Sequence, residues 1–178
     1  MGNKLSNNLK INDPFIKRLI IYIIIAVLIR VFIFNITSVK GSSMMPTLED
    51  GDKILTQKLS LYFSSPKRGD IVVIHAPDKK YYNYIKRVIG LPGDRIEIIG
   101  GKLFVNDLLQ IEDYISEDST LPYTIENSWI VPENQIFVMG DNRGHSKDSR
   151  IFGTVNMKDI IGISFFRIYP IFKIGSLK

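Results

Sequence analysis

The feature that most constrains the fold is an apolar run near the N-terminus. Residues 19–39 read LIIYIIIAVLIRVFIFNITSV and contain one charged residue, Arg30. A membrane-spanning helix needs about 20 predominantly apolar residues. A cleavable signal peptide has a shorter apolar core and an A-x-A-like exit, and no such exit follows Phe34. A run that is apolar on every face also has no place in so small a soluble core. The sequence therefore predicts one transmembrane helix over residues 19–39.

Basic residues precede this run. Residues 1–18 contain four lysine or arginine residues and a single acidic residue, Asp13. Because basic flanks of a membrane span stay in the cytoplasm, we expect residues 1–18 to form a cytoplasmic tail. Residues 40–178 would then form an extracytoplasmic domain, and the protein would be a single-pass protein of the cell membrane.

Composition excludes several kinds of site. The 178 residues include no cysteine, which rules out a disulfide framework, a thiolate zinc site and a cysteine nucleophile. The two histidines, His75 and His145, are too few for a histidine-based metal cluster, so we expect no metal and no cofactor. The formal net charge of +5 suits contact with anionic lipid. No basic stripe interleaved with aromatic residues indicates nucleic acid binding.

The rest of the chain has the pattern of a mainly β protein. Short segments rich in β-branched and aromatic residues, bounded by turn residues, are typical of strands. The two-glycine turn at residues 100–101 predicts a hairpin. Residues 110–130 are polar and irregular, which predicts an exposed loop. The expected strands are 53–56, 70–75, 82–89, 95–99, 102–105, 135–139 and 160–168.

A serine-containing loop follows the apolar run. Ser43 stands in the stretch SMMPTL, and Pro46 disfavours helix at Met45. Taken alone, this stretch is typical of a turn with two buried methionines. A serine hydroxyl becomes a nucleophile only beside a base, and the two histidines are poorly placed for that task.

Lys86 is a candidate base. Tyr84, Lys86 and Val88 share one face of the expected strand. These neighbours can desolvate the amine and lower its pKa from the usual value of about 10.4. The alternative is an ordinary surface lysine whose stem lies over apolar neighbours.

The stretch from Gly140 to Arg150, GDNRGHSKDSR, is dense in short polar side chains. Such side chains bond to nearby backbone and hold a loop in a fixed shape. Arg143 stands where a calcium-binding loop needs a ligand, so that pattern fails. The stretch is either a solvated turn or a rigid platform that orients a base.

Taken together, four stretches resemble the successive conserved boxes of bacterial type I signal peptidases. They are residues 43–48, 68–70, 86–94 and 140–150. The resemblance covers the chain from about residue 15 to its end. It implies a Ser–Lys serine endopeptidase on a mainly antiparallel β-fold, anchored by one N-terminal transmembrane helix, that cleaves signal peptides from exported preproteins. The family's variable second β-domain would be a small insert around residues 95–135.

The resemblance also implies roles for single residues. Ser43 would be the nucleophile and Lys86 the general base. Ser146 would hydrogen-bond Lys86 and orient it. Four charged residues would brace the polar loop: Asp141, Asp148, Arg150 and, as the ion partner of Asp141, Arg87.

The substrate pockets would be shallow and apolar, to suit small side chains at the −1 and −3 positions. Their candidate walls are Val39, Met44, Val73 and Ile85, for which plain core packing is the alternative. Some relatives have a hydroxyl two residues before the nucleophile as an oxyanion donor. This chain has Gly41 there, which leaves the backbone N–H of Ser43 as the expected donor.

The expected partners are signal peptides and the lipid bilayer, with secretion machinery nearby. A related Ser–Lys peptidase, of the mitochondrial inner-membrane or pilin-maturation type, is one alternative. A membrane-anchored β-domain without catalysis is another, although intact Ser43, Lys86 and Ser146 argue against an inactive paralogue.

Overall fold

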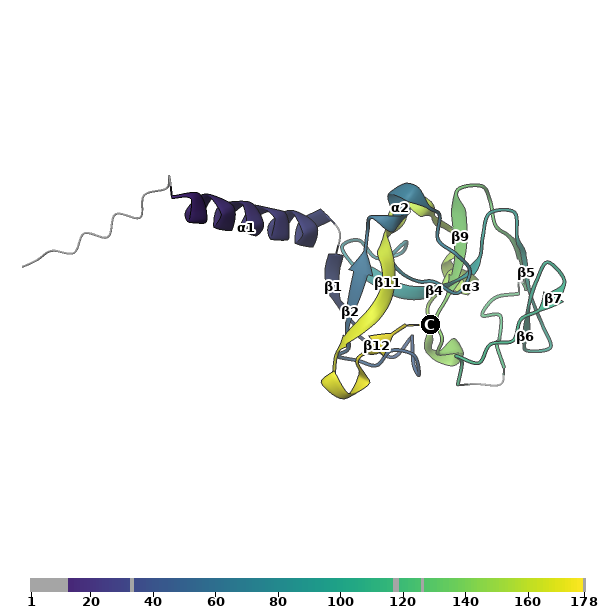
Figure 1. Cartoon of the computed structure of the whole chain (residues 1–178). Coiled ribbons are helices and arrows are strands. Elements are labelled where there is room, and N and C mark those ends of the chain that lie inside the picture. Colours follow the sequence, from purple (N-terminus) through teal and green to yellow (C-terminus); the bar gives the residue numbers. More distant parts are fainter. Residues whose placement is uncertain (1–12, 33, 117–118, 126, 178) are drawn as a thin grey trace, which may run out of the picture.

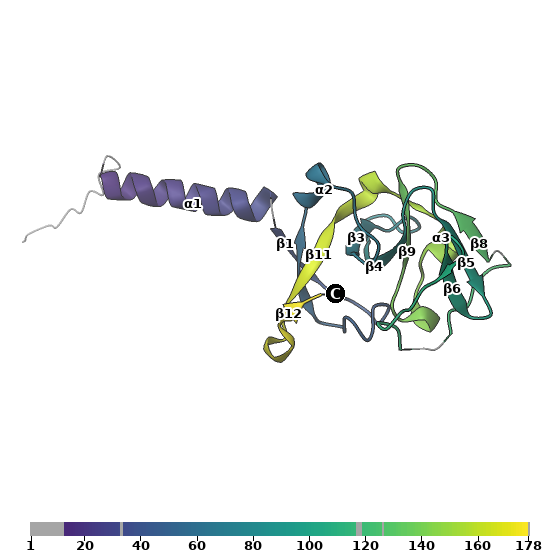
Figure 2. The ribbon, with the colours of Figure 1, turned by 45° about the vertical axis from the view of Figure 1, so that its right-hand side comes forward.

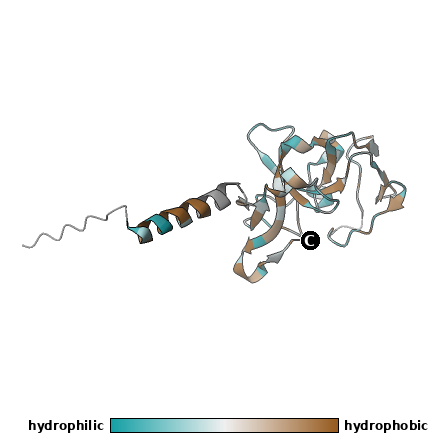
Figure 3. Ribbon diagram, turned by 45° about the horizontal axis from the view of Figure 1, so that its top comes forward, coloured by the Kyte–Doolittle hydropathy of each residue, from teal (hydrophilic) through white to brown (hydrophobic). Residues whose placement is uncertain are grey.

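The computed structural model describes residues 13–32, 34–116, 119–125 and 127–177. Helix α1 (Pro14–Phe32) projects away from a β domain that contains the rest of the described chain (Figure 1). The side chains from Leu19 to Ile25 on this helix are all exposed, and Figure 3 shows a hydrophobic stretch in the middle of the helix ribbon. None of the helices in the described part of the chain is both long enough and apolar enough to cross a membrane.

The expected helix over residues 19–39 is wrong at its C-terminal end. The helix ends at Phe32, and β1 (Phe34–Ser38) pairs antiparallel with β2 (Lys53–Gln57). Apolar residues alternate with polar residues along β1, which is the period of a strand rather than of a helix. The basic residues Lys4 and Lys10, which argued for a cytoplasmic tail, lie outside the described residues.

The main sheet has eight strands in the order β1-β2-β11-β3-β4-β9-β10, with β12 paired to β11. Every pairing is antiparallel, which confirms the expected mainly antiparallel β-fold. The strands not yet bounded are β3 (Ile71–His75), β4 (Asn83–Gly90), β9 (Gln135–Met139), β10 (Val155–Asn156), β11 (Ile160–Tyr169) and β12 (Gly175–Ser176).

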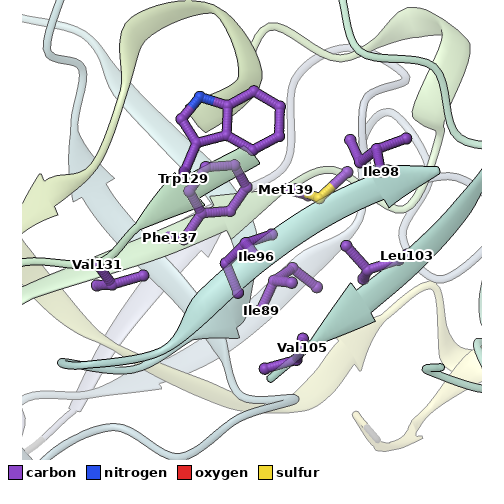
Figure 4. Close-up of a cluster of buried hydrophobic side chains, with 9 residues drawn as sticks. All are labelled: Ile89, Ile96, Ile98, Leu103, Val105, Trp129, Val131, Phe137 and Met139. Atoms are coloured by element: carbon purple, nitrogen blue, oxygen red, sulfur yellow. The ribbon is translucent and has the colours of Figure 1, made fainter. Parts of the chain in front are cut away.

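A second, four-stranded antiparallel sheet lies beside the main one (Figure 2). Its strand order is β7-β6-β5-β8, and its strands are β5 (Arg95–Ile99), β6 (Lys102–Val105), β7 (Leu108–Leu109) and β8 (Ser128–Ile130). A cluster of nine buried apolar side chains joins this sheet to β4 and β9 (Figure 4). Within it the rings of Trp129 and Phe137 lie 5.2 Å apart. Burial of one such side chain is worth roughly 1.5–3 kcal/mol, so the two sheets hold each other in place.

Short helices fill the connections. They are α2 (Ser60–Phe63), α3 (Ser149–Phe152) and three 3₁₀ turns, η1 (Arg143–His145), η2 (Met157–Asp159) and η3 (Ile171–Lys173).

A separate apolar cluster packs the loop between β1 and β2 onto the main sheet. Its buried members are Val39, Met44, Leu48, Ile54 and Ile71. This cluster fixes the backbone on both sides of Ser43.

Candidate active site

The loop between β1 and β2 presents Ser43 at its turn. Val39 N donates to Asp52 O at 2.8 Å and Gly51 N donates to Val39 O at 3.1 Å, so the two ends of the loop are tied together. Met44 is buried and Ser43 is half-buried. Because the residue after Ser43 is anchored in the apolar cluster, the backbone that carries the serine hydroxyl is held in place.

Lys86 lies on β4 and meets this serine. Its Nζ donates to Ser43 Oγ at 2.8 Å, and the lysine is only 3% exposed. The amine also lies 5.4 Å from the centre of the Tyr84 ring, the neighbour that the face pattern of the strand indicated. Burial lowers the pKa of Lys86 to about 8, against the attraction of the Asp148 and Asp141 carboxylates, which raises it. A lysine with that pKa is partly neutral near physiological pH and can accept a proton.

The polar loop from Gly140 to Arg150 packs against the serine. Asn142 N donates to Ser43 O at 3.1 Å. A Cβ added to Gly140 would collide with both Ser43 O and Ser146 Oγ, so only glycine allows this approach. Asp148 ties the two ends of this loop together, because it accepts hydrogen bonds from Gly140 N at 3.0 Å and from the buried Arg150 side chain at 2.8 Å.

Arg87 and Asp141 form the expected ion pair. Arg87 Nη2 and Nε lie 2.7 and 2.9 Å from the two oxygens of Asp141, and both side chains are buried. Thr47 Oγ1 also donates to Asp141, at 2.5 Å. Asp141 therefore links the residue next to Lys86 with the loop that carries Ser43.

The four apolar residues expected to line substrate pockets share one cleft with the two reactive groups. This cleft has a volume of about 590 Å³. Its lining includes Val39, Met44, Val73 and Ile85, together with Ser43 and Lys86. Tyr81, Tyr82 and Tyr84 also line it, and the sequence did not indicate the first two as wall residues.

A family model described as signal peptidase, peptidase S26, matches residues 13–169. This chain belongs to the peptidase S26 family. The resemblance of the four sequence stretches is thereby confirmed.

Members of this family are similar in sequence to most of this chain. Signal peptidase I P from Bacillus subtilis subsp. natto is 41% identical over 92% of this chain and 92% of its own length. Signal peptidase I from Leptolyngbya laminosa is 36% identical over 91% of this chain and 82% of its own. A crystal structure of a signal peptidase I from Enterococcus faecalis V583 aligns with a TM-score of 0.47, at 31% identity, over 56% of this chain and 97% of that one.

The hydrogen bond expected between Ser146 and Lys86 is not formed in this S26 site. Ser146 Oγ is buried and has no partner among the described residues. It nevertheless lies close to the backbone of Ser43, because one Cβ on Gly140 would touch both Ser146 Oγ and the Ser43 carbonyl. We expect the hydroxyl to receive a bond from Lys86 once that amine carries a third proton.

For Ser146→Ala we therefore expect kcat to fall about ten- to a hundredfold, because a bond to a charged group is worth roughly 1.5–3 kcal/mol. Removal of an unpartnered buried hydroxyl should not lower the melting temperature. Steady-state kinetics and thermal melts check both parts. An unchanged kcat would assign the residue a structural role alone.

Gly41 occupies a backbone conformation that favours glycine. Its φ is +87°, and its N–H donates to Asp50 Oδ1 at 2.7 Å. An added Cβ would meet no atom within 4 Å, so any penalty comes from the backbone and not from a clash. The absence of a side-chain hydroxyl two residues before Ser43 therefore has a conformational cause.

We expect Gly41→Ser to cost about 1–3 kcal/mol of stability and to lower kcat about tenfold through displacement of Ser43. Gly175→Ser is the matched control, because that glycine has open space and no positive φ. Chemical denaturation and kcat should separate the two variants. Full activity of Gly41→Ser would contradict the account of the loop.

The irregular segment before β8 contributes residues that sequence reasoning missed. Glu112 and Thr120 both accept bonds from the buried Arg143 side chain, and Tyr123 OH donates to Arg143 O at 2.6 Å. The expected exposed loop over residues 110–130 is thus wrong at Glu112 and Thr120, whose side chains are buried, whereas Tyr123 is exposed. No local pattern distinguishes them, because their partners lie at least 20 residues away.

The two histidines take no part in the dyad. His75 pairs with Asn83 and His145 with Asn142, and both are exposed.

Proposed function

We propose that this protein is a serine endopeptidase that removes N-terminal signal peptides from exported preproteins, with Ser43 as nucleophile and Lys86 as general base. The observation that carries the proposal is the 2.8 Å contact between a buried lysine amine and a serine hydroxyl. The two groups lie in a cleft with apolar walls, in a chain of the S26 family.

The contact suits acyl transfer. Neutral Lys86 takes the proton of Ser43 Oγ as that oxygen attacks the scissile carbonyl, and it then passes the proton to the leaving amine. The products of this half are the free mature N-terminus and an acyl ester on Ser43. In the second half, Lys86 takes a proton from water, whose oxygen attacks the ester. The signal peptide then leaves with a carboxylate, and Ser43 recovers its proton.

The developing oxyanion needs hydrogen-bond donors, each worth roughly 10²–10³ in rate. The backbone N–H of Ser43 is the donor that we propose. Ser42 is exposed and its carbonyl already accepts bonds from Met45 N and Asn142 Nδ2.

We also propose that α1 tethers the domain to the cell membrane with residues 40–178 outside the cytoplasm. The exposed apolar side chains of residues 19–25 support this, because a contiguous exposed apolar surface marks an interaction site. Enzyme and substrate would then meet at one depth, which raises their effective concentration. Protease added to intact spheroplasts should degrade residues 40–178, and complete protection would contradict this orientation.

Incubation of the detergent-solubilised protein with a preprotein tests the reaction. Mass spectrometry should find a new N-terminus just after the signal peptide, following small residues at −1 and −3. The Ser43→Ala protein is the control and should yield none. Cleavage of a prepilin alone would favour the pilin-maturation reading, and no cleavage of any preprotein would favour a non-catalytic domain.

A further inference from the structure

Glu112 lies in the irregular segment between β7 and β8, far from Lys86 in sequence, but its side chain is only 6% exposed. Its two oxygens accept bonds from Arg143 Nη1 and Nη2 at 2.8 and 2.5 Å. Tyr114 OH donates to the same carboxylate at 2.6 Å. A two-point pair of this kind fixes the orientation of the guanidinium as well as its position.

The third nitrogen of that guanidinium contacts the backbone of Gly140. Arg143 Nε donates to the Gly140 carbonyl at 3.1 Å. Gly140 is the residue that packs directly against Ser43 O and Ser146 Oγ. A continuous series of contacts therefore runs from Glu112 through Arg143 and Gly140 to the backbone of Ser43.

The same segment touches the lysine side of the site. The Tyr114 ring lies 4.0 Å from the Arg87 guanidinium, which is adjacent to Lys86 in β4. A buried ion pair is a poor source of net stability, because desolvation offsets most of its attraction. An orienting role is a better explanation of why two charges are buried here.

We propose that Glu112 is a positioning residue for the Ser43–Lys86 dyad, which acts through Arg143 to hold the Gly140 backbone against Ser43. The inference rests on the proposed function, because that function makes Ser43 and Lys86 a catalytic dyad. Asp148 and Arg150 hold the Gly140 backbone from within the polar loop. Glu112 would hold the same backbone from the irregular segment.

The protonation of Lys86 is a sensitive measure of this support. The charged groups that act on the amine are Asp148, Asp141 and Arg150, and its nearest neutral partners are Ser43 and the Tyr84 ring. If the Gly140 backbone loosens, water gains access to the amine and its pKa rises toward the ordinary value of about 10.4. Loss of a negative charge alone would shift the pKa of a lysine downward, so an upward shift reports the loop.

The test compares Glu112→Gln with Asp113→Asn, a neighbouring exposed carboxylate, in the full-length protein. Carbon-13 labelled lysine reports the pKa of Lys86 by NMR, and cleavage of a preprotein gives kcat and KM. For Glu112→Gln we expect a raised Lys86 pKa and a kcat about ten- to a hundredfold lower, since a misplacement of about 1 Å costs about a hundredfold. KM should change little. Asp113→Asn should match the wild type in every measurement.

Tyr114→Phe keeps the test decisive if Glu112→Gln fails to fold. It removes only the bond to Glu112 and keeps the ring against Arg87, so it should shift the Lys86 pKa in the same direction by less. A folded variant of either kind with an unchanged or lowered Lys86 pKa would overturn the inference. Failure of the wild type to cleave any preprotein would refute the proposed function instead, and the NMR measurement would still decide the role of Glu112.

Discussion

Lys86→Met is expected to abolish cleavage while the protein remains folded. Methionine fills nearly the same volume with a flexible apolar chain, but it cannot take the proton of Ser43 Oγ, which lies 2.8 Å from the lysine amine. Removal of a general base typically costs 10²–10⁴ in rate. Residual kcat below about 1% of the wild type, with an unchanged circular dichroism spectrum, would meet the expectation.

The pH dependence follows from the same group. Lys86 acts only when neutral, so kcat/KM of the wild type should rise with pH through the lowered pKa of about 8 and then level off. Alanine at His75 or His145 should leave most of this activity, because both rings are exposed and pair with asparagines, away from Lys86. A His145→Ala protein as inactive as Lys86→Met would refute the dyad.

Lys86→Met should raise stability near neutral pH although it removes activity. The unfolded chain binds the lysine proton up to about pH 10.4, whereas the folded protein releases it near pH 8. Wild-type stability must therefore rise with pH between these two values. Below pH 8 the buried ammonium costs on the order of 3 kcal/mol, since one pKa unit is about 1.4 kcal/mol. Lys86→Met should thus melt higher than the wild type at pH 7, and this advantage should shrink toward pH 10.

Much of the fold could be predicted from local pattern. Alternation and turn residues located β5 and β6 at their observed bounds. Lys86 was distinguished because Tyr84 and Val88 share its strand face, and the ring of Tyr84 does lie beside the amine. These successes concern features that neighbours in sequence determine.

The errors concern partners that are distant in sequence. The run through residues 34–38 is apolar enough to extend a helix, but its backbone pairs with β2, some twenty residues on. Glu112 sits in a segment with no periodicity, and its partner Arg143 comes 31 residues later. Pairing within the main sheet joins β1 to β2, and the tertiary fold brings Glu112 to Arg143, and no local rule describes either contact.

Asp141→Ala is expected to cause the largest loss of stability among single changes at the site. The carboxylate is fully buried and accepts hydrogen bonds from Arg87 Nε, Arg87 Nη2 and the Thr47 hydroxyl. Removal of one partner of a buried pair costs about 3–5 kcal/mol, because the remaining charge keeps its desolvation penalty. Glu49→Gln is the control, since Glu49 pairs with Lys173 at the surface. That change should leave stability nearly unchanged.

Activity should fall along with stability in Asp141→Ala, because the carboxylate joins the Ser43 loop, through Thr47, to the strand that carries Lys86. Thr47→Val separates the two effects, since it removes only the link to the serine loop and retains the Arg87–Asp141 pair. We expect this variant to lose kcat about tenfold with less than half of the stability loss of Asp141→Ala. Urea denaturation and single-turnover cleavage of both variants provide the comparison. Wild-type kcat in Thr47→Val would mean that the pair stabilises β4 alone, and that Ser43 is held by its apolar cluster without help from Asp141.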